Sequence, residues 1–171
     1  MMRFVQRLSI GLAACAALCA LPGAAVAGGS IKLLRSVGFA EEAFVRPQVK
    51  SECNLENRVP EWIQQFAQKH GIEVELVDAL PATGLVLELE IADAIETGNA
   101  WTGRQKGLVI QGRLLENGQL VGNFRGRRMT SGGFFGGYKG ACAFFGRCAK
   151  TLGSDVAEWL QSPGKSSNIG G

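Results

Sequence analysis

The stretch KGLVIQGRLLENGQLVGNFRGRRMT, residues 106–130, decides the fold of this 171-residue chain. Two runs of alternating apolar and polar residues, 106–115 and 119–130, flank Glu116-Asn117-Gly118. Alternation with a period of two is typical of strands with one buried face, and Asn-Gly between such runs is a strong signal for a tight turn. The stretch therefore predicts an antiparallel hairpin.

The register of this hairpin depends on which side chains it buries. A two-residue turn at Asn117-Gly118 would place Arg125 opposite Ile110, on the buried face, and Arg127 would follow it. A three-residue loop with a left-handed Gly118 gives a wholly apolar buried face instead. We therefore predict the three-residue loop with a bulge, in which Leu114 pairs with Leu120, Gly112 with Gly122 and Ile110 with Phe124.

Other elements follow outward from the hairpin. Residues 85–91 alternate as a further strand, and residues 72–77 form a short strand or an extended connector. Apolar residues at helical spacing predict helices over 56–70 and 141–160. Residues 44–53 are a strand candidate that Pro47 confines to an edge, and 92–102 are a polar loop. The prediction is an α+β fold, a mostly antiparallel sheet with two helices packed on one face.

The N-terminus has the pattern of an export signal. Arg3 and Arg7 precede an apolar run of residues 8–20, and Ala25-Val26-Ala27 is typical of a cleavage site. We expect residues 1–27 to be a signal peptide, residues 28–160 a single α/β domain, and the Ser/Gly/Pro-rich residues 161–171 a disordered tail. The protein is then periplasmic or secreted. Leu12-Ala13-Ala14-Cys15 leaves an alternative, an outer-membrane lipoprotein anchored through Cys15.

Charge is unevenly distributed along the exported part. Residues 28–100 carry 6 basic and 12 acidic side chains, whereas residues 101–171 carry 10 basic and 3 acidic ones. The two halves nearly cancel, which argues against general nucleic-acid binding. The apolar run of residues 8–20 is too short to span a bilayer, and no later run qualifies, so no transmembrane segment is expected.

Three cysteines, Cys53, Cys142 and Cys148, follow the predicted cleavage site. An oxidising compartment favours one disulfide and one remaining thiol. We favour Cys53–Cys142, which lie side by side if both helices start at the same end of the sheet. The alternative, Cys142–Cys148, needs an irregular first turn in the second helix. His70 is the only histidine, so neither a metal site nor a cofactor site is expected.

The region from Gly84 to Leu160 carries a resemblance. Its alternating strand, its Asn-Gly hairpin and the segment GGYKGACAFFGRCAKTLGSDVAEWL resemble uncharacterised proteobacterial periplasmic proteins. Their architecture is similar to the small α/β domains of envelope accessory lipoproteins, such as activators of penicillin-binding proteins. The resemblance implies a fold more than an activity.

Candidate functional residues cluster in the glycine-rich segment before the second helix. Phe134, Phe135, Tyr138 and Lys139, together with Trp101, form either a cover for the core or an exposed binding patch. No catalytic residue is identified. The favoured hypothesis is a non-enzymatic protein-interaction accessory of the cell envelope, whose partner is another envelope protein. The alternative is a glycan-binding protein or an enzyme that uses these aromatic residues as a stacking platform; the oligomeric state is open.

Overall fold

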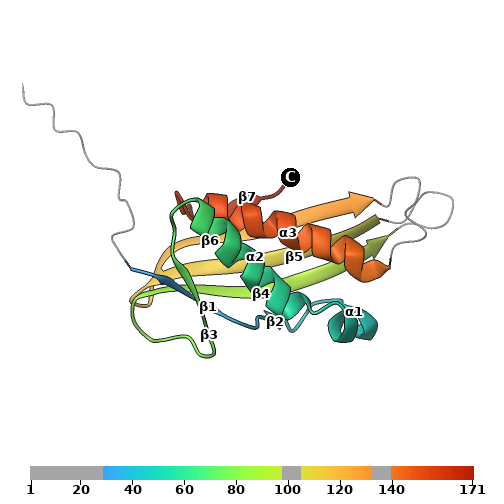
Figure 1. Ribbon diagram of the computed structural model, residues 1–171, viewed down its shortest axis with the longest axis horizontal. Coiled ribbons are helices and arrows are strands. Elements are labelled where there is room, and N and C mark those ends of the chain that lie inside the picture. The colour runs from blue at the N-terminus through green and yellow to red at the C-terminus, as the bar shows by residue number, and fades with distance from the viewer. Residues whose placement is uncertain (1–28, 98–104, 132–139) are drawn as a thin grey trace, which may run out of the picture.

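The computed structural model describes residues 29–97, 105–131 and 140–171 (Figure 1). Within these residues the chain forms three helices and seven strands. In order they are β1 (Ile31–Leu34), β2 (Gly38–Phe39), α1 (Pro47–Glu52), α2 (Leu55–Lys69), β3 (Val74–Val77), β4 (Leu85–Thr97), β5 (Gln105–Glu116), β6 (Gln119–Ser131), α3 (Ala141–Trp159) and β7 (Ser167–Ile169). The α+β prediction is confirmed, and α2 and α3 correspond to the two predicted helices.

The sheet is mixed, so the prediction of a mostly antiparallel sheet is wrong. Its strand order is β3-β1-β4-β5-β6-β7, and β2 pairs with β4 beside β1. Only the β4–β5 and β5–β6 pairs are antiparallel, whereas β1–β3, β1–β4, β2–β4 and β6–β7 are parallel. The parallel pairs arise because α2 returns the chain before β3, and α3 does the same before β7.

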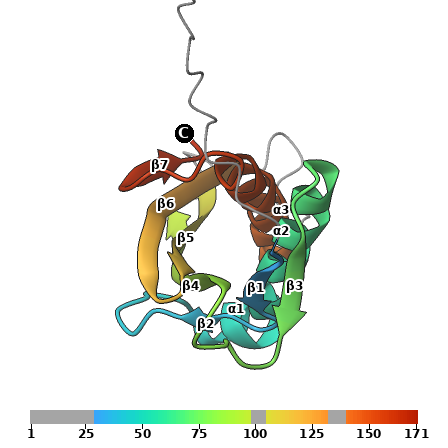
Figure 2. The ribbon, with the colours of Figure 1, turned by 90° about the vertical axis from the view of Figure 1, so that its left-hand side faces the viewer.

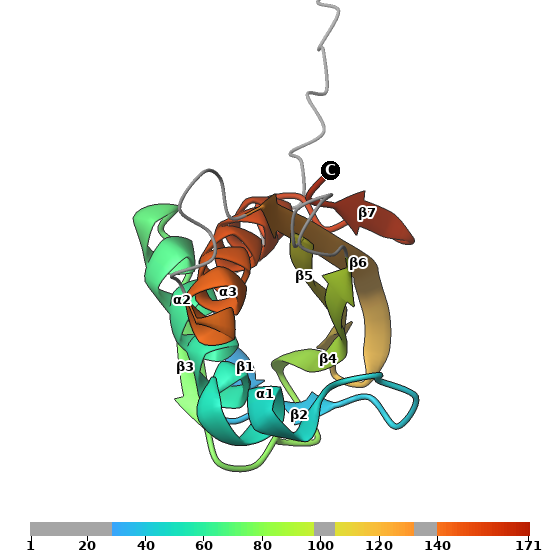
Figure 3. The ribbon, with the colours of Figure 1, turned by 90° about the vertical axis from the view of Figure 1, so that its right-hand side faces the viewer.

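The sheet curls, and α2 and α3 lie side by side on its inner face (Figures 2 and 3). Side chains of the two helices and of the central strands meet there without exposure to solvent. The largest fully buried side chains include Leu33, Ile63, Leu87, Ile91, Leu108, Ile110, Phe145 and Leu152. Among the described residues, no charged or polar side chain is buried. The core therefore forms between the helices and one face of the sheet, which leaves the opposite, outer face for solvent.

The hairpin has a different register from the predicted one. Asn117 and Gly118 both have positive φ, 50° and 80°, and form a two-residue turn in which Glu116 pairs with Gln119. Val121 is then an extra residue, because Leu115 pairs with Leu120 but Leu114 pairs with Gly122. This bulge turns Arg125 outward even though the turn has only two residues. Ile110 consequently pairs with Gly126 and Phe124 with Gly112.

The segment predicted as a polar loop, residues 92–102, continues β4 as far as Thr97. Ile91 pairs with Ile110 and Asp93 with Val109, so Ala92 is an extra residue in β4. The bulge shifts the inward positions by one, and Ala94 instead of Asp93 enters the core. This shift interrupts the alternation of apolar and polar residues, so the sequence pattern does not reveal that β4 continues to Thr97.

Two further segments differ from expectation. Residues 47–52 form α1 instead of a strand, since Pro47 occupies the first turn, where a missing N–H costs nothing. Within residues 161–171, where the sequence predicts disorder, β7 pairs with β6. The Trp159 Nε1–H donates to Ser167 Oγ at 3.2 Å, and the Ser166 N–H donates to Asn123 Oδ1 at 2.8 Å. These specific bonds hold a segment whose composition alone favours disorder.

The contact between α2 and α3 depends on Gly153. A Cβ built on Gly153 would lie 2.6 Å from the Cβ of Trp62 and 2.9 Å from its carbonyl carbon. We expect Gly153→Ala to lower the free energy of unfolding by about 1–3 kcal/mol, because overpacking outweighs the gain in helix propensity. Gly146→Ala on the same helix meets only the flexible Arg58 side chain and should raise stability by up to about 1 kcal/mol. Urea denaturation of both variants measures the difference; equal effects would contradict the close packing.

Candidate binding surface

The five residues predicted to form a stacking platform lie outside the described residues. They are Trp101, Phe134, Phe135, Tyr138 and Lys139, and their role stays a prediction. The described residues show another candidate, the outer face of β4, β5 and β6, opposite α2 and α3. This face has two adjoining depressions, which share Arg125 and Asn168. We call the one around Glu88, Glu90, Gln111 and Arg113 the polar trough. We call the one around Asp93, Val109 and Arg127 the apolar hollow.

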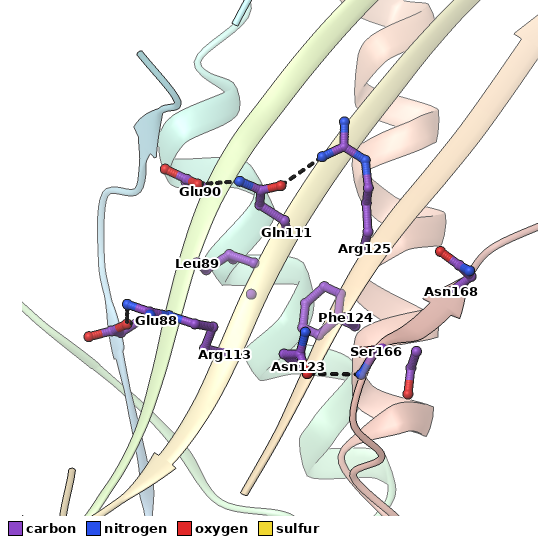
Figure 4. A pocket seen from close by; sticks show the side chains of 12 residues that line it. Glu88, Leu89, Glu90, Gln111, Arg113, Asn123, Phe124, Arg125, Ser166 and Asn168 are labelled. Atoms are coloured by element: carbon purple, nitrogen blue, oxygen red, sulfur yellow. Dashed lines mark hydrogen bonds and ion pairs between the residues drawn. The ribbon is translucent and has the colours of Figure 1, made fainter. Parts of the chain in front are cut away.

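A cross-strand ladder crosses the polar trough (Figure 4). Gln111 on β5 stands between Glu90 on β4 and Arg125 on β6, donating to the carboxylate and accepting from the guanidinium Nη1 at 2.7 Å. A second rung joins Arg113 to Glu88, with Nε 3.0 Å from Oε2. Each side chain is held by its neighbour on the next strand, as cross-strand pairing predicts. The surface is therefore ordered before any ligand arrives.

The segment around β7 forms the far wall of the polar trough, which encloses about 720 Å³. Ser166 has a φ of 55°, and its N–H bond to Asn123 Oδ1 fixes the wall to β6. The Asn123 N–H also donates to the Gly164 carbonyl at 3.1 Å. Asn168, which is exposed, adds a free amide to this wall. The polar trough thus offers carboxylate, guanidinium and amide groups for hydrogen bonding.

The apolar hollow adjoins the polar trough and encloses about 330 Å³. Its centre is a straight cross-strand row, in which Asp93 pairs with Val109 and Val109 pairs with Arg127. Val109 is 4% exposed and forms the floor, and Ile95 contributes an apolar wall, while the Ile169 side chain packs toward the core beside Gly126. The row therefore reads acidic, apolar and basic from β4 to β6.

The two bulges decide which side chains reach this face. Without the extra residue Ala92, Asp93 would follow Leu89 and Ile91 into the core. Without the extra residue Val121, Arg125 and Arg127 would face the helices. Bulges commonly redirect side chains in this way at functional sites. Both charges of the row consequently lie on the outer face.

An exposed aromatic residue borders the apolar hollow. Phe44, in the loop between β2 and α1, is 86% exposed and lines a small depression of about 160 Å³ with Asp93 and Ile95. The loop projects from the body of the fold (Figure 3). Arg46 Nη1 lies 2.8 Å from Glu96 Oε2, which attaches the loop to the edge of β4. A large apolar side chain held in water in this way is a common feature of interaction surfaces.

The outer face combines charged, amide and apolar side chains from β4, β5 and β6. The groups with clear pKa shifts lie elsewhere: Lys32 lowers the pKa of Glu75, and Asp155 raises the pKa of Arg128. Among the residues that the structure describes, no three His, Cys, Asp or Glu side chains gather as metal ligands. None of the described helices combines the length and apolar character needed to cross a bilayer. What the face provides is hydrogen bonding, charge pairing and apolar contact.

The cysteines are arranged as the favoured pairing requires. Cys53 is bonded to Cys142, with Cα atoms 4.8 Å apart, and this joins the end of α1 to the first turn of α3. Cys148 is a buried free thiol, 2% exposed. The bond places α1 beside α3 and fixes where the Phe44 loop leaves the core.

Cys148 should be chemically silent in the folded protein. Burial raises the pKa of its thiol, which lowers the fraction of reactive thiolate at neutral pH. In the native protein we expect iodoacetamide to leave Cys53, Cys142 and Cys148 unmodified. After urea is added, it should modify Cys148. Mass spectrometry of both samples measures this. Rapid modification of Cys148 in the native state would contradict its burial.

Comparisons with known proteins give a structural likeness only. Neither the protein-family models nor the curated proteins contain a match. A solved dodecamer of PelC from Paraburkholderia phytofirmans is similar at a TM-score of 0.51 and 14% identity, covering 79% of this chain and 90% of that one. A minor lipoprotein from Acinetobacter baumannii gives 0.49 and 7% identity, over 78% of this chain and 92% of that one. The likeness to PelC supports the fold alone.

Sequence reasoning missed Phe44 and the wall around β7. Phe44 stood at the start of a supposed strand, where half its surface would be buried. Residues 166–168 belonged to a supposed disordered tail. Glu88 pairs with Arg113 across the β4–β5 ladder. Lys106 pairs with Glu96 on the helix side of the sheet, because the Ala92 bulge turns Glu96 inward.

Proposed function

We propose that this protein is an exported, non-enzymatic accessory of the cell envelope that binds another envelope protein through the polar trough. The observation that carries the proposal is the ordered ladder Glu90–Gln111–Arg125, which crosses an open depression and leaves acceptors on one side and donors on the other. Side chains already held in place lose little conformational entropy on binding. Such a surface suits a polar partner segment.

Export is supported by two independent features. The N-terminal residues 1–27 have the charge and hydropathy pattern of a signal peptide. The Cys53–Cys142 bond is of the kind that persists in oxidising compartments. N-terminal sequencing of the protein recovered from the periplasm tests this step. A start near Gly28 supports it, and a lipidated Cys15 would replace it with the lipoprotein alternative.

Site-specific photo-cross-linking in intact cells tests the partner. A photoreactive amino acid replaces Arg113, which lies in the polar trough, and in a matched control it replaces the exposed Arg147 on α3. We expect a discrete protein adduct from position 113 and none from position 147. Arg125→Glu, which reverses a charge of the ladder, should remove the adduct.

Two results would refute this function. Equal adducts from both positions would show that contact with proteins is not specific to the polar trough. The absence of any adduct at position 113 would remove the protein partner. A glycan in place of a protein in the adduct would favour the alternative function, glycan binding.

A further inference from the structure

The outer face carries a second, self-complementary surface. The cross-strand row over the apolar hollow reads Asp93, Val109, Arg127, with Phe44 on the far side of Asp93 and strand β7 on the far side of Arg127. Neighbouring strands are about 4.8 Å apart, so the acidic and basic ends of the row are separated by about 10 Å on either side of Val109. The row is thus antisymmetric in charge about its centre.

We propose that this surface is a two-fold interface between two copies of this chain. A two-fold axis that runs parallel to β5 above Val109, in the plane between the two outer faces, places Asp93 of each copy opposite Arg127 of the other. The same rotation carries Phe44 of each copy toward the β7 side of the other. A two-fold interface requires that one patch contact itself in this reciprocal way.

The charges of the row have no competing partners in the described part of the chain. There, no acidic side chain lies within 4 Å of Arg127 and no basic side chain within 4 Å of Asp93. The nearest polar contact of Arg127 is a weak one, with Met129 Sδ at 3.7 Å. By contrast, Glu88 and Glu90 on the same strand are occupied by Arg113 and Gln111. In the described part of the chain, both charges of the row are therefore available for an intermolecular pair.

Phe44 supplies the apolar anchor of the interface. At 86% exposure it is the most exposed large apolar side chain of the described residues. It lines a depression that shares Asp93 and Ile95 with the hollow. Aromatic side chains that enter a depression on a partner contribute a large share of binding energy. The inward core does not use Phe44, so its loss leaves the single chain intact.

Charge reversal tests the interface in the purified exported protein. Light scattering after size exclusion should give twice the single-chain mass for the wild type at about 0.1 mM, a concentration at which micromolar affinity is saturating. Asp93→Arg alone and Arg127→Asp alone should each give single chains, because like charges then meet twice per interface. The double variant D93R/R127D should restore the dimer.

Mixing the two single variants gives the sharpest result. In a mixed dimer, Arg at position 93 of one chain faces Asp at position 127 of the other, and the second contact keeps its native Asp93–Arg127 pair. We expect each variant alone to be a single chain and the mixture to form a dimer of one chain of each kind. Circular dichroism and an intact Cys53–Cys142 bond establish that both variants are folded.

Phe44→Ser should weaken the dimer by about tenfold or more, whereas Leu120→Ser, at the exposed hairpin end, should leave it unchanged. A wild-type protein that stays a single chain at about 0.1 mM, or folded variants that do not pair on mixing, would overturn the interface. Failure of the interface leaves the cross-linking test of the polar trough unaffected, because Asp93, Arg127 and Phe44 do not line the trough. A dimer about this axis would cover Gln111 on the same strand, so the second copy and the envelope partner would compete for the outer face.

Discussion

Replacing Phe124 with Asp should abolish cooperative folding. Phe124 is 3% exposed, and its ring lies 4.8 Å from that of Trp159 and over Gly112, whose missing side chain makes room for it. Loss of a buried phenylalanine costs about 3–5 kcal/mol, and an unpaired buried carboxylate adds several more. The sum is comparable to the whole stability of a typical domain, about 5–15 kcal/mol.

Arg125→Asp is the matched control, because position 125 is the next residue on the same strand and faces the solvent. It removes the hydrogen bond to Gln111 and should cost no more than about 1 kcal/mol. Urea denaturation monitored by circular dichroism measures both variants. Similar losses from the two substitutions would mean that the Val121 bulge does not set the inward face of β6.

The second large effect is expected from removal of the disulfide. Cys53–Cys142 closes a loop with a sequence separation of 89 residues and fixes α1 against α3. On the chain-entropy view, a loop of this length stabilises the folded state by roughly 4–5 kcal/mol, and measured losses are about 2–5 kcal/mol. We expect the double variant Cys53→Ala/Cys142→Ala to lose a comparable amount of unfolding free energy.

Denaturation of the wild type with and without reductant measures the stabilisation by the Cys53–Cys142 bond independently. The reduced wild type should have the same unfolding free energy as the double variant. Cys148→Ala is the control, since it removes a small buried side chain and should cost roughly 1 kcal/mol. A double variant as stable as the wild type would show that the bond contributes nothing. Non-reducing peptide mapping should recover a single bridged peptide pair containing Cys53 and Cys142.

Local signals in the sequence were sufficient for the helices and the hairpin. Val59, Ile63 and Ala67 recur at helical spacing and are buried in α2, as predicted. Leu87, Leu89 and Ile91 alternate with Glu88 and Glu90 and, together with Leu85, point inward in β4. These features depend on neighbours within one turn or one strand, so periodicity detects them.

The candidate site was less predictable, because it depends on two single-residue bulges. Asp93 and Arg127 reach the outer face only after Ala92 and Val121 shift the alternation. A bulge forms where a strand accommodates its partner, and no residue in either strand signals it by type. The exposed position of Phe44 was not predicted for a related reason, because Pro47 permits both an edge strand and the first turn of a helix.

By itself, the sequence determined that α2, α3 and the β5–β6 hairpin form, and that Arg125 must avoid the core. Local spacing and the cost of burying a charge are enough for those conclusions. The tertiary structure decided the parallel pairing of β1, β3 and β7, the register of β6 and the surface that results. Strand order and bulges are set by contacts between residues far apart in the chain, such as Gly164 with Asn123, whose free energy no local pattern contains.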